Sequence, residues 1–205
     1  MDSLLTIKQC PNADVGKGKH VIDNSLGFGK KVRRPDERPQ VKQKWKPPDD
    51  GQLKLNTDGA FTADGRAGAG MVIRDAGGRA IFAACRSIIA CADALDAELA
   101  AMEEGLMLAL HWTTEPFVVE VDSSDAIKLV AQGTPNLSRY ATRVSRIRES
   151  LREREISVTK VGRDANGVSH RLAALGRTQG RTEFWLQDFP PDVAATILAD
   201  CTGPV

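Results

Sequence analysis

The stretch Leu53-Lys-Leu-Asn-Thr-Asp-Gly-Ala-Phe61 alternates in the manner of a β-strand and carries one acidic residue, Asp58, in its middle. Every second side chain falls on the same face, which is the period of a half-buried strand. Aspartate is depleted inside strands. The Asp58-Gly59 pair therefore marks either a turn or a strand position at which a carboxylate is held for a purpose such as metal binding.

The composition indicates one domain of ordinary size with additions. The chain has 205 residues, which is enough to bury a sizeable core. Its charge is nearly balanced, with 28 basic and 27 acidic side chains. Residues 1–50 hold 11 basic and 7 acidic side chains, which leaves 17 and 20 for residues 51–205. The total charge therefore identifies no partner, but the beginning of the chain is basic.

Neither the cysteines nor the apolar runs indicate export or a membrane. The four cysteines lack CxxC spacing and histidines placed to complete a zinc site, which is typical of reduced thiols in an intracellular protein. The first residues lack a sustained apolar region and a small-residue cleavage site, and no stretch approaches the ~18 apolar residues of a membrane span. We expect a protein of the nucleus or cytoplasm that is not secreted and contacts no membrane.

Residues 1–50 are predicted to form a flexible basic arm, because they are rich in polar residues and lack periodicity. Lys30–Pro35 within it is a nuclear-import signal, a phosphate-binding tail or a solvated basic linker. Trp45-Lys46-Pro47-Pro48 forms a stiff lead-in whose Trp45 can anchor the arm on the folded domain. At the other end, residues 178–205 are expected to form an appendage that packs on the core.

Between these ends, in residues 51–177, the hydrophobic pattern predicts an α/β fold. Three strands joined by short turns form an antiparallel meander, and two later strands are connected through helices. Gly68 and Gly70 indicate a bulge or a place where another backbone comes close. The prediction is a mixed five-stranded sheet, three antiparallel strands followed by two parallel ones, flanked by helices. The strands are expected at residues 53–61, 67–75, 79–89, 117–121 and 156–161, and the helices at 94–111, 125–132, 137–154 and 168–175.

Three acids sit where such a fold can gather them: Asp58 on the first strand, Glu98 in the first helix and Asp122 after the fourth strand. Crowded carboxylates repel each other unless one is protonated or a cation neutralises them. Oxygen ligands of this kind suit Mg²⁺ or Mn²⁺. Each acid alone also has an ordinary explanation, as a turn residue, a solvated helix residue and a helix cap respectively.

Four motifs together resemble type 1 ribonuclease H domains. They are Asn56 to Ala60, Ala97-Glu98-Leu99, Val121 to Ser124, and Asn166 to Ala173, in that order. More narrowly, the chain resembles plant reverse-transcriptase-like ribonuclease H proteins of retroelement origin, in its Trp-x-Pro-Pro lead-in and its Gly-x-Gly-x-x-x-Arg-Asp second strand. The resemblance covers about Trp45 to Leu175.

The resemblance implies a Mg²⁺-dependent (or Mn²⁺-dependent) endonuclease that hydrolyses the RNA strand of RNA/DNA hybrids with two metal ions. Asp58, Glu98 and Asp122 would hold the ions. The family's fourth acid is replaced by His170, which makes His170 a candidate catalytic residue, a weakened metal ligand or only a polar helix residue. Reduced activity is therefore expected. The alternative hypothesis is a retroelement-derived nucleic-acid-binding module that has lost robust catalysis.

Hybrid binding requires contacts that sense the shape of the duplex and its 2′-hydroxyls. Arg139, Arg143 and Arg146, in the helix predicted at residues 137–154, are spaced four and three residues apart. They form either a phosphate-binding stripe or a solvated charged face. A monomer without a protein partner is expected. The predicted substrate-binding residues are Asn56, Gly59, Gly68, Gly70, Ser123, Arg139, Arg143, Arg146 and Asn166.

Overall fold

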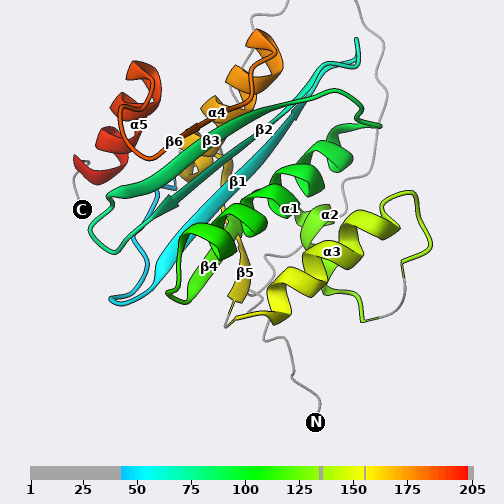
Figure 1. Cartoon of the computed structure of the whole chain (residues 1–205), viewed down its shortest axis with the longest axis horizontal. Helices are drawn as coiled ribbons and strands as arrows, with labels where there is room; N and C mark the ends of the chain where they lie inside the picture. Colours follow the sequence, from blue (N-terminus) through cyan, green and yellow to red (C-terminus); the bar gives the residue numbers. More distant parts are fainter. Residues whose placement is uncertain (1–42, 134–135, 155, 203–205) are drawn as a thin grey trace, which may run out of the picture.

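The structure is a computed structural model that describes residues 43–133, 136–154 and 156–202. The basic Lys30–Pro35 segment and most of the predicted arm lie outside these residues. The described chain forms one six-stranded sheet with the order β5-β4-β1-β2-β3-β6 (Figure 1). Its strands are β1 (Leu53–Phe61), β2 (Ala67–Arg74), β3 (Ala80–Ile88), β4 (Phe117–Val121), β5 (Ile156–Lys160) and β6 (Glu183–Trp185).

Helices cover both faces of the sheet. One face packs against the apolar side of α1, with α2 and α3 beside it, and the other packs against α4 and α5 (Figure 1). The helix predicted at residues 94–111 is confirmed as α1, and its Leu99, Met102 and Leu106 form a fully buried apolar stripe. The helices are α1 (Ala94–Trp112), α2 (Ser124–Ala131), α3 (Ala141–Arg152), α4 (Gly167–Gln179) and α5 (Pro191–Thr202), and a 3-10 turn, Arg163–Asn166, precedes α4.

The predicted α/β sheet is confirmed, with antiparallel β1-β2-β3 and with β4 and β5 parallel to β1. The sequence missed β6, which pairs with β3 in a region expected to be an appendage. Three residues are too few to show a strand period. Its Phe184 lies between Phe82 and Trp112, with ring centroids 5.4 and 5.1 Å away, so aromatic packing holds this edge strand in place.

Three helices differ clearly from the prediction, the first being α4, which runs to Gln179 rather than ending near residue 175. Helix α3 begins at Ala141 rather than near residue 137, because the Asn136 side chain accepts the N–H of Ser138 at 2.8 Å and shapes a turn there. Helix α5 lies in the region expected only as an appendage, and it starts at Pro191, a residue suited to the first position of a helix. No helix among the described residues is long and apolar enough to cross a membrane.

Gly68 and Gly70 on β2 provide the close backbone approach that the sequence indicates. A Cβ atom at Gly68 would overlap the carbonyl of Ala173, and one at Gly70 would overlap the carbonyl of Ser169 and the amide of Ala173. The approaching backbone is that of α4. These glycines therefore have a packing role, which brings the beginning of α4 down onto the sheet beside β1.

Candidate active site

Asp58, Glu98 and Asp122 converge at one edge of the sheet. Strands β1 and β4 run parallel with Asn56 beside Glu120. Asp58 and Asp122 each lie two residues further along their chains, just beyond the last β1–β4 pair. Their side chains are therefore neighbours on the same face of the sheet. One carboxylate oxygen from each of the three acids lies within 4.8 Å of the others. The pairing of two parallel strands thus creates the cluster that the sequence predicts.

Glu98 reaches this cluster because Gly59 lets α1 approach β1. A Cβ atom at Gly59 would overlap the backbone of Ala97 and Glu98. The N–H of Gly59 donates to Oε2 of Glu98 at 3.2 Å and orients the carboxylate. Gly59 was predicted to leave room for a substrate, whereas its observed neighbour is the first turn of α1.

The cluster is electrostatically costly in the absence of a cation. Burial, followed by the charge of Asp122, raises the pKa of Asp58 to about 6, although His170 and Arg163 act in the opposite direction. Burial, followed by the charges of Asp58 and Asp122, raises the pKa of Glu98 to about 8. In both cases burial is the larger cause and the charge of neighbouring carboxylates the next, so the folded protein disfavours the charged forms of Asp58 and Glu98.

His170, at the beginning of α4, lies against the central acid of the cluster. Its Nδ1 is 3.1 Å from Oδ2 of Asp58, while 54% of its side chain stays exposed. The cation Arg163 lies 3.5 Å from Oδ2 of Asp122 and was not singled out in the sequence. Its position in the turn that follows β5 could have indicated it, because β5 is parallel to β4 and ends at the same edge of the sheet.

Buried hydrogen bonds of Asn56 and Asn166 connect β1, which carries Asp58, to the beginning of α4, which carries His170. Asn56 Nδ2 donates to Oε2 of Glu120 at 3.0 Å and to Oδ1 of Asn166 at 3.3 Å. Asn166 Nδ2 donates to the carbonyl of Thr57 at 2.9 Å. Both asparagines are fully buried. Ser123 accepts the N–H of Ala126 at 3.2 Å and caps α2, so these predicted substrate-binding residues have structural partners.

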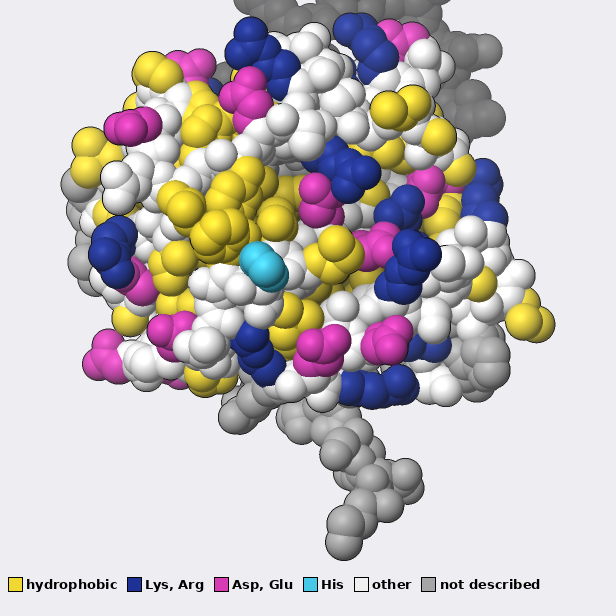
Figure 2. Space-filling model, viewed as in Figure 1, with side chains coloured by type: hydrophobic (Ala, Val, Ile, Leu, Met, Phe, Trp, Pro, Cys, Tyr) yellow, Lys and Arg dark blue, Asp and Glu magenta, His cyan; other side chains and the backbone are white. Residues whose placement is uncertain are grey.

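The predicted arginine stripe lies apart from the cluster and faces acids of α1. Arg143 pairs with Asp96 and Glu103, and Arg146 also pairs with Glu103. Arg139 lies 3.4 Å from a carboxylate oxygen of Asp93. Figure 2 shows Lys and Arg side chains interspersed with Asp and Glu on this face of the molecule, without a continuous basic patch. Phosphate contact by these arginines stays a prediction.

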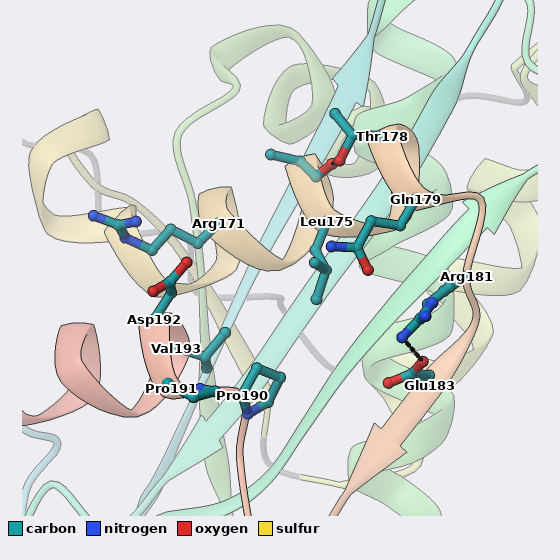
Figure 3. Close-up of a pocket in the computed structure, with 11 residues that line it drawn as sticks. Arg171, Leu175, Thr178, Gln179, Arg181, Glu183, Pro190, Pro191, Asp192 and Val193 are labelled. Atoms are coloured by element: carbon teal, nitrogen blue, oxygen red, sulfur yellow. Dashed lines mark hydrogen bonds and ion pairs between the residues drawn. The ribbon is translucent and has the colours of Figure 1, made fainter.

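A pocket of about 520 Å³ lies apart from the acidic cluster, between α4, β6 and α5. Arg171 and Asp192 line one end of it, and Arg181 and Glu183, 3.3 Å apart, line the other (Figure 3). None of the three clustered acids lines this pocket.

The residues present fit a divalent cation. Three carboxylates offer only hard oxygen ligands, the type that Mg²⁺ and Mn²⁺ prefer. Asp58 is buried, and the other two acids each place a carboxylate oxygen within 4.8 Å of one of its own. A bound dication would remove the repulsion that raises the pKa of Asp58 and Glu98.

A family model described as reverse transcriptase-like matches residues 56–176, and these residues include all three acids and His170. The chain belongs to the reverse transcriptase-like family. The match begins at Asn56 on β1 and ends in α4, so β6 and α5 lie beyond the part that this family shares. No curated protein matches the sequence.

Solved ribonucleases H share the fold of this reverse transcriptase-like chain. The ribonuclease H1 of Halobacterium salinarum NRC-1 is 23% identical, with a TM-score of 0.56 over 61% of this chain and 96% of its own. LC11-RNase H1, isolated from compost and solved with an RNA/DNA hybrid, is 18% identical, with a TM-score of 0.51 over 62% and 98%. The foamy viral protease-reverse transcriptase, also solved with a hybrid, is 17% identical, with a TM-score of 0.53 over 77% and 24%.

Replacement of Glu98 by Gln should stabilise the metal-free protein above pH 8 by about 4 to 5 kcal/mol, and much less at about pH 5. The pKa of Glu98 is about 8 when folded, against 4.5 as its ordinary value. Between these values the folded state retains a proton that the unfolded state releases, so the free energy of unfolding falls as the pH rises. Glutamine carries no charge and avoids this loss. Urea unfolding in EDTA at the two pH values measures it.

Glu149→Gln is the matched control, because Glu149 is an exposed glutamate on α3. It should change the free energy of unfolding by less than about 0.5 kcal/mol at either pH. Excess Mg²⁺ should reverse the order of wild type and Glu98→Gln, since only wild type keeps all three ligands. Equal stability of the two proteins in EDTA at both pH values would contradict the electrostatic explanation.

Proposed function

We propose that this protein is a Mg²⁺-dependent endonuclease that hydrolyses the RNA strand of RNA/DNA hybrids and also accepts Mn²⁺. The observation that carries the proposal is the convergence of Asp58, Glu98 and Asp122 within 4.8 Å. The reverse transcriptase-like family and the ribonuclease H fold support it. Two of the similar structures were solved with an RNA/DNA hybrid.

Asp58 is the central ligand in this proposal, and Glu98 and Asp122 each complete one side, for a total of two ions. Ions bound there would supply Lewis-acid stabilisation of the scissile phosphate and activation of the attacking water. Three carboxylates leave two dications with a net positive charge, which favours an anionic substrate. Arg163 beside Asp122 adds a cation at the same edge.

The chain's own groups orient this site and move protons. The Gly59 N–H holds Glu98 in place. His170 contacts Asp58 through Nδ1 and has an exposed side chain, so it can exchange a proton with the departing 3′-oxygen or with solvent. An imidazole adds no negative charge in either protonation state, and the second ion is therefore expected to bind more weakly than the first.

Substrate contact is proposed for Ser123, which follows Asp122, and for arginines of the separate stripe on and just before α3. Arg139 and Arg146 keep 64% and 67% of their side chains exposed, so they can reach phosphates despite their acidic partners. Asn166 is buried and bonded to Asn56, Thr57 and Ser169, so it supports the site from within instead. Arg143 is more fully engaged with Asp96 and Glu103. A monomer of retroelement origin acting on hybrids in the nucleus or cytoplasm completes the proposal.

Cleavage of a labelled RNA/DNA hybrid by the purified full-length chain, in Mg²⁺ and separately in Mn²⁺, tests this function. Asp58→Asn should reduce the rate by more than about 100-fold, because even the partners of metal ligands account for 10- to 100-fold. Asp64→Asn, on the exposed turn of the same hairpin, is the control and should retain wild-type rates. Absence of cleavage in both ions, or equal cleavage by Asp58→Asn, would refute the proposal.

A second candidate function is favoured by His170 in place of an acid: a hybrid-binding module with little turnover. It predicts salt-sensitive binding of the hybrid, because phosphate contacts release counterions. His170→Asp should then increase cleavage by about tenfold or more, since a fourth carboxylate strengthens binding of the second ion. His111→Asp, on α1, is the control. A loss of activity in His170→Asp would show instead that the histidine is part of a working site.

A further inference from the structure

Arg74, at the end of β2, is a fully buried cation held by both ends of the described chain. Its guanidinium lies 3.6 Å from the ring centroid of Trp45, which is itself buried as the sequence predicted for an anchor. Its Nη1 donates to Oδ2 of Asp200 on α5 at 2.7 Å. Its Nη2 donates to Oδ1 of Asn56 at 3.1 Å. Three separate segments thus meet at one side chain.

Stability alone is a poor explanation for this arrangement. Desolvating an ion pair costs about as much as the pair regains, and apolar residues of similar size often serve as well. The Nε–H of Arg74 is also buried without a hydrogen-bond partner among the described residues, which adds to the cost. What an apolar residue could not supply is the directed hydrogen bond to Asn56.

Hydrogen bonds from Arg74 and Trp45 together determine the orientation of the Asn56 amide. Its Oδ1 accepts from both Arg74 Nη2 and Trp45 Nε1, at 3.1 and 3.0 Å. Two donors at the oxygen oblige the Nδ2 group to point the other way, toward Glu120 and Asn166. Arg74 and Trp45 therefore select the one amide orientation that can bind Asn166.

Asn166 connects the oriented amide of Asn56 to the acidic site. Its Nδ2 donates to the carbonyl of Thr57, the residue before Asp58, at 2.9 Å. Its Oδ1 accepts from Asn56 and, at 2.8 Å, from Oγ of Ser169, the residue before His170. One buried amide thus ties the strand that carries Asp58 to the helix that carries His170.

We propose that Arg74 is a positioning residue of the acidic site, and that Trp45 and Asp200 hold it in that role. The C-terminal helix α5 is then a functional part of the site, although the family match ends at residue 176. The part of this proposal that concerns catalysis rests on the proposed nuclease function. The part that concerns the geometry of the metal ligands is independent of that function.

The test compares Arg74→Lys, Asp200→Asn and Asp200→Glu in the full chain. Lysine keeps the charge but cannot donate to Asp200 and Asn56 in the geometry of a guanidinium. Asn at position 200 keeps the shape without the charge, and Glu restores the charge. Arg79→Lys is the control, because Arg79 forms an exposed pair with Asp75 at the adjacent turn. The readouts are Mn²⁺ affinity by calorimetry, side-chain amide NMR signals of Asn56 and Asn166, hybrid kcat and KM, and thermal unfolding.

Arg74→Lys and Asp200→Asn should weaken Mn²⁺ binding by about tenfold and shift both asparagine signals, with Asp200→Glu recovering most of the loss. Hybrid kcat should fall by a similar factor while KM changes little. Weaker Mn²⁺ binding by Arg74→Lys and Asp200→Asn, together with a wild-type chain that cleaves no hybrid, would support the positioning role and refute the nuclease function. Lower thermal stability with unchanged Mn²⁺ affinity and unchanged asparagine signals would overturn the positioning role.

Discussion

Repulsion between three carboxylates is the constraint on which the rest of the structure depends. Asp58, Glu98 and Asp122 come from a strand, a helix and the end of a second strand, and they point into one space. Burial keeps water from screening them, which is why the pKa of Glu98 rises to about 8. Such an arrangement persists only because the surrounding fold determines it, and it becomes favourable when a dication binds.

Several close contacts serve to hold the acids in this unfavourable arrangement. Gly59 admits the first turn of α1, and Gly68 and Gly70 admit α4. The parallel pairing of β1 and β4 sets Asp58 beside Asp122. Behind them, the buried network from Arg74 through Asn56 to Asn166 connects the strand of Asp58 with the helix of His170. Small residues and buried amides thus hold the three acids in place.

Most helices and strands could be predicted, because their apolar residues recur with the period of the element. The hydrophobic pattern of residues 51–177 was sufficient for five strands and the main helices, and the order of these elements predicted that the three acids meet. Strand β6 is too short to show a period. Arg163 was missed because a single cation in a loop carries no pattern of its own, and only its place after β5, which ends at the same sheet edge as β4, could have indicated it.

The sequence indicated what a residue is suited to do more readily than which residues it contacts. Close approach at Gly68 and Gly70 was expected, but only the structure shows that the approaching backbone belongs to α4. The arginine spacing on α3 was evident, but Glu103, about forty residues away, is its observed partner. The role of Arg74 could not be predicted, because it depends on Asp200, over a hundred residues later in the chain. Contacts between distant segments leave no signal in either one alone.

The central claim is that Asp58, Glu98 and Asp122 form a divalent-cation site. Anomalous diffraction from crystals of the full chain soaked in Mn²⁺ measures this most directly. A Mn²⁺ peak in contact with oxygens of all three carboxylates is the expected result, with any second peak near Asp58 weaker because His170 replaces an acid there. Crystals with saturating Mn²⁺ in solution and no anomalous peak among these carboxylates would contradict the claim.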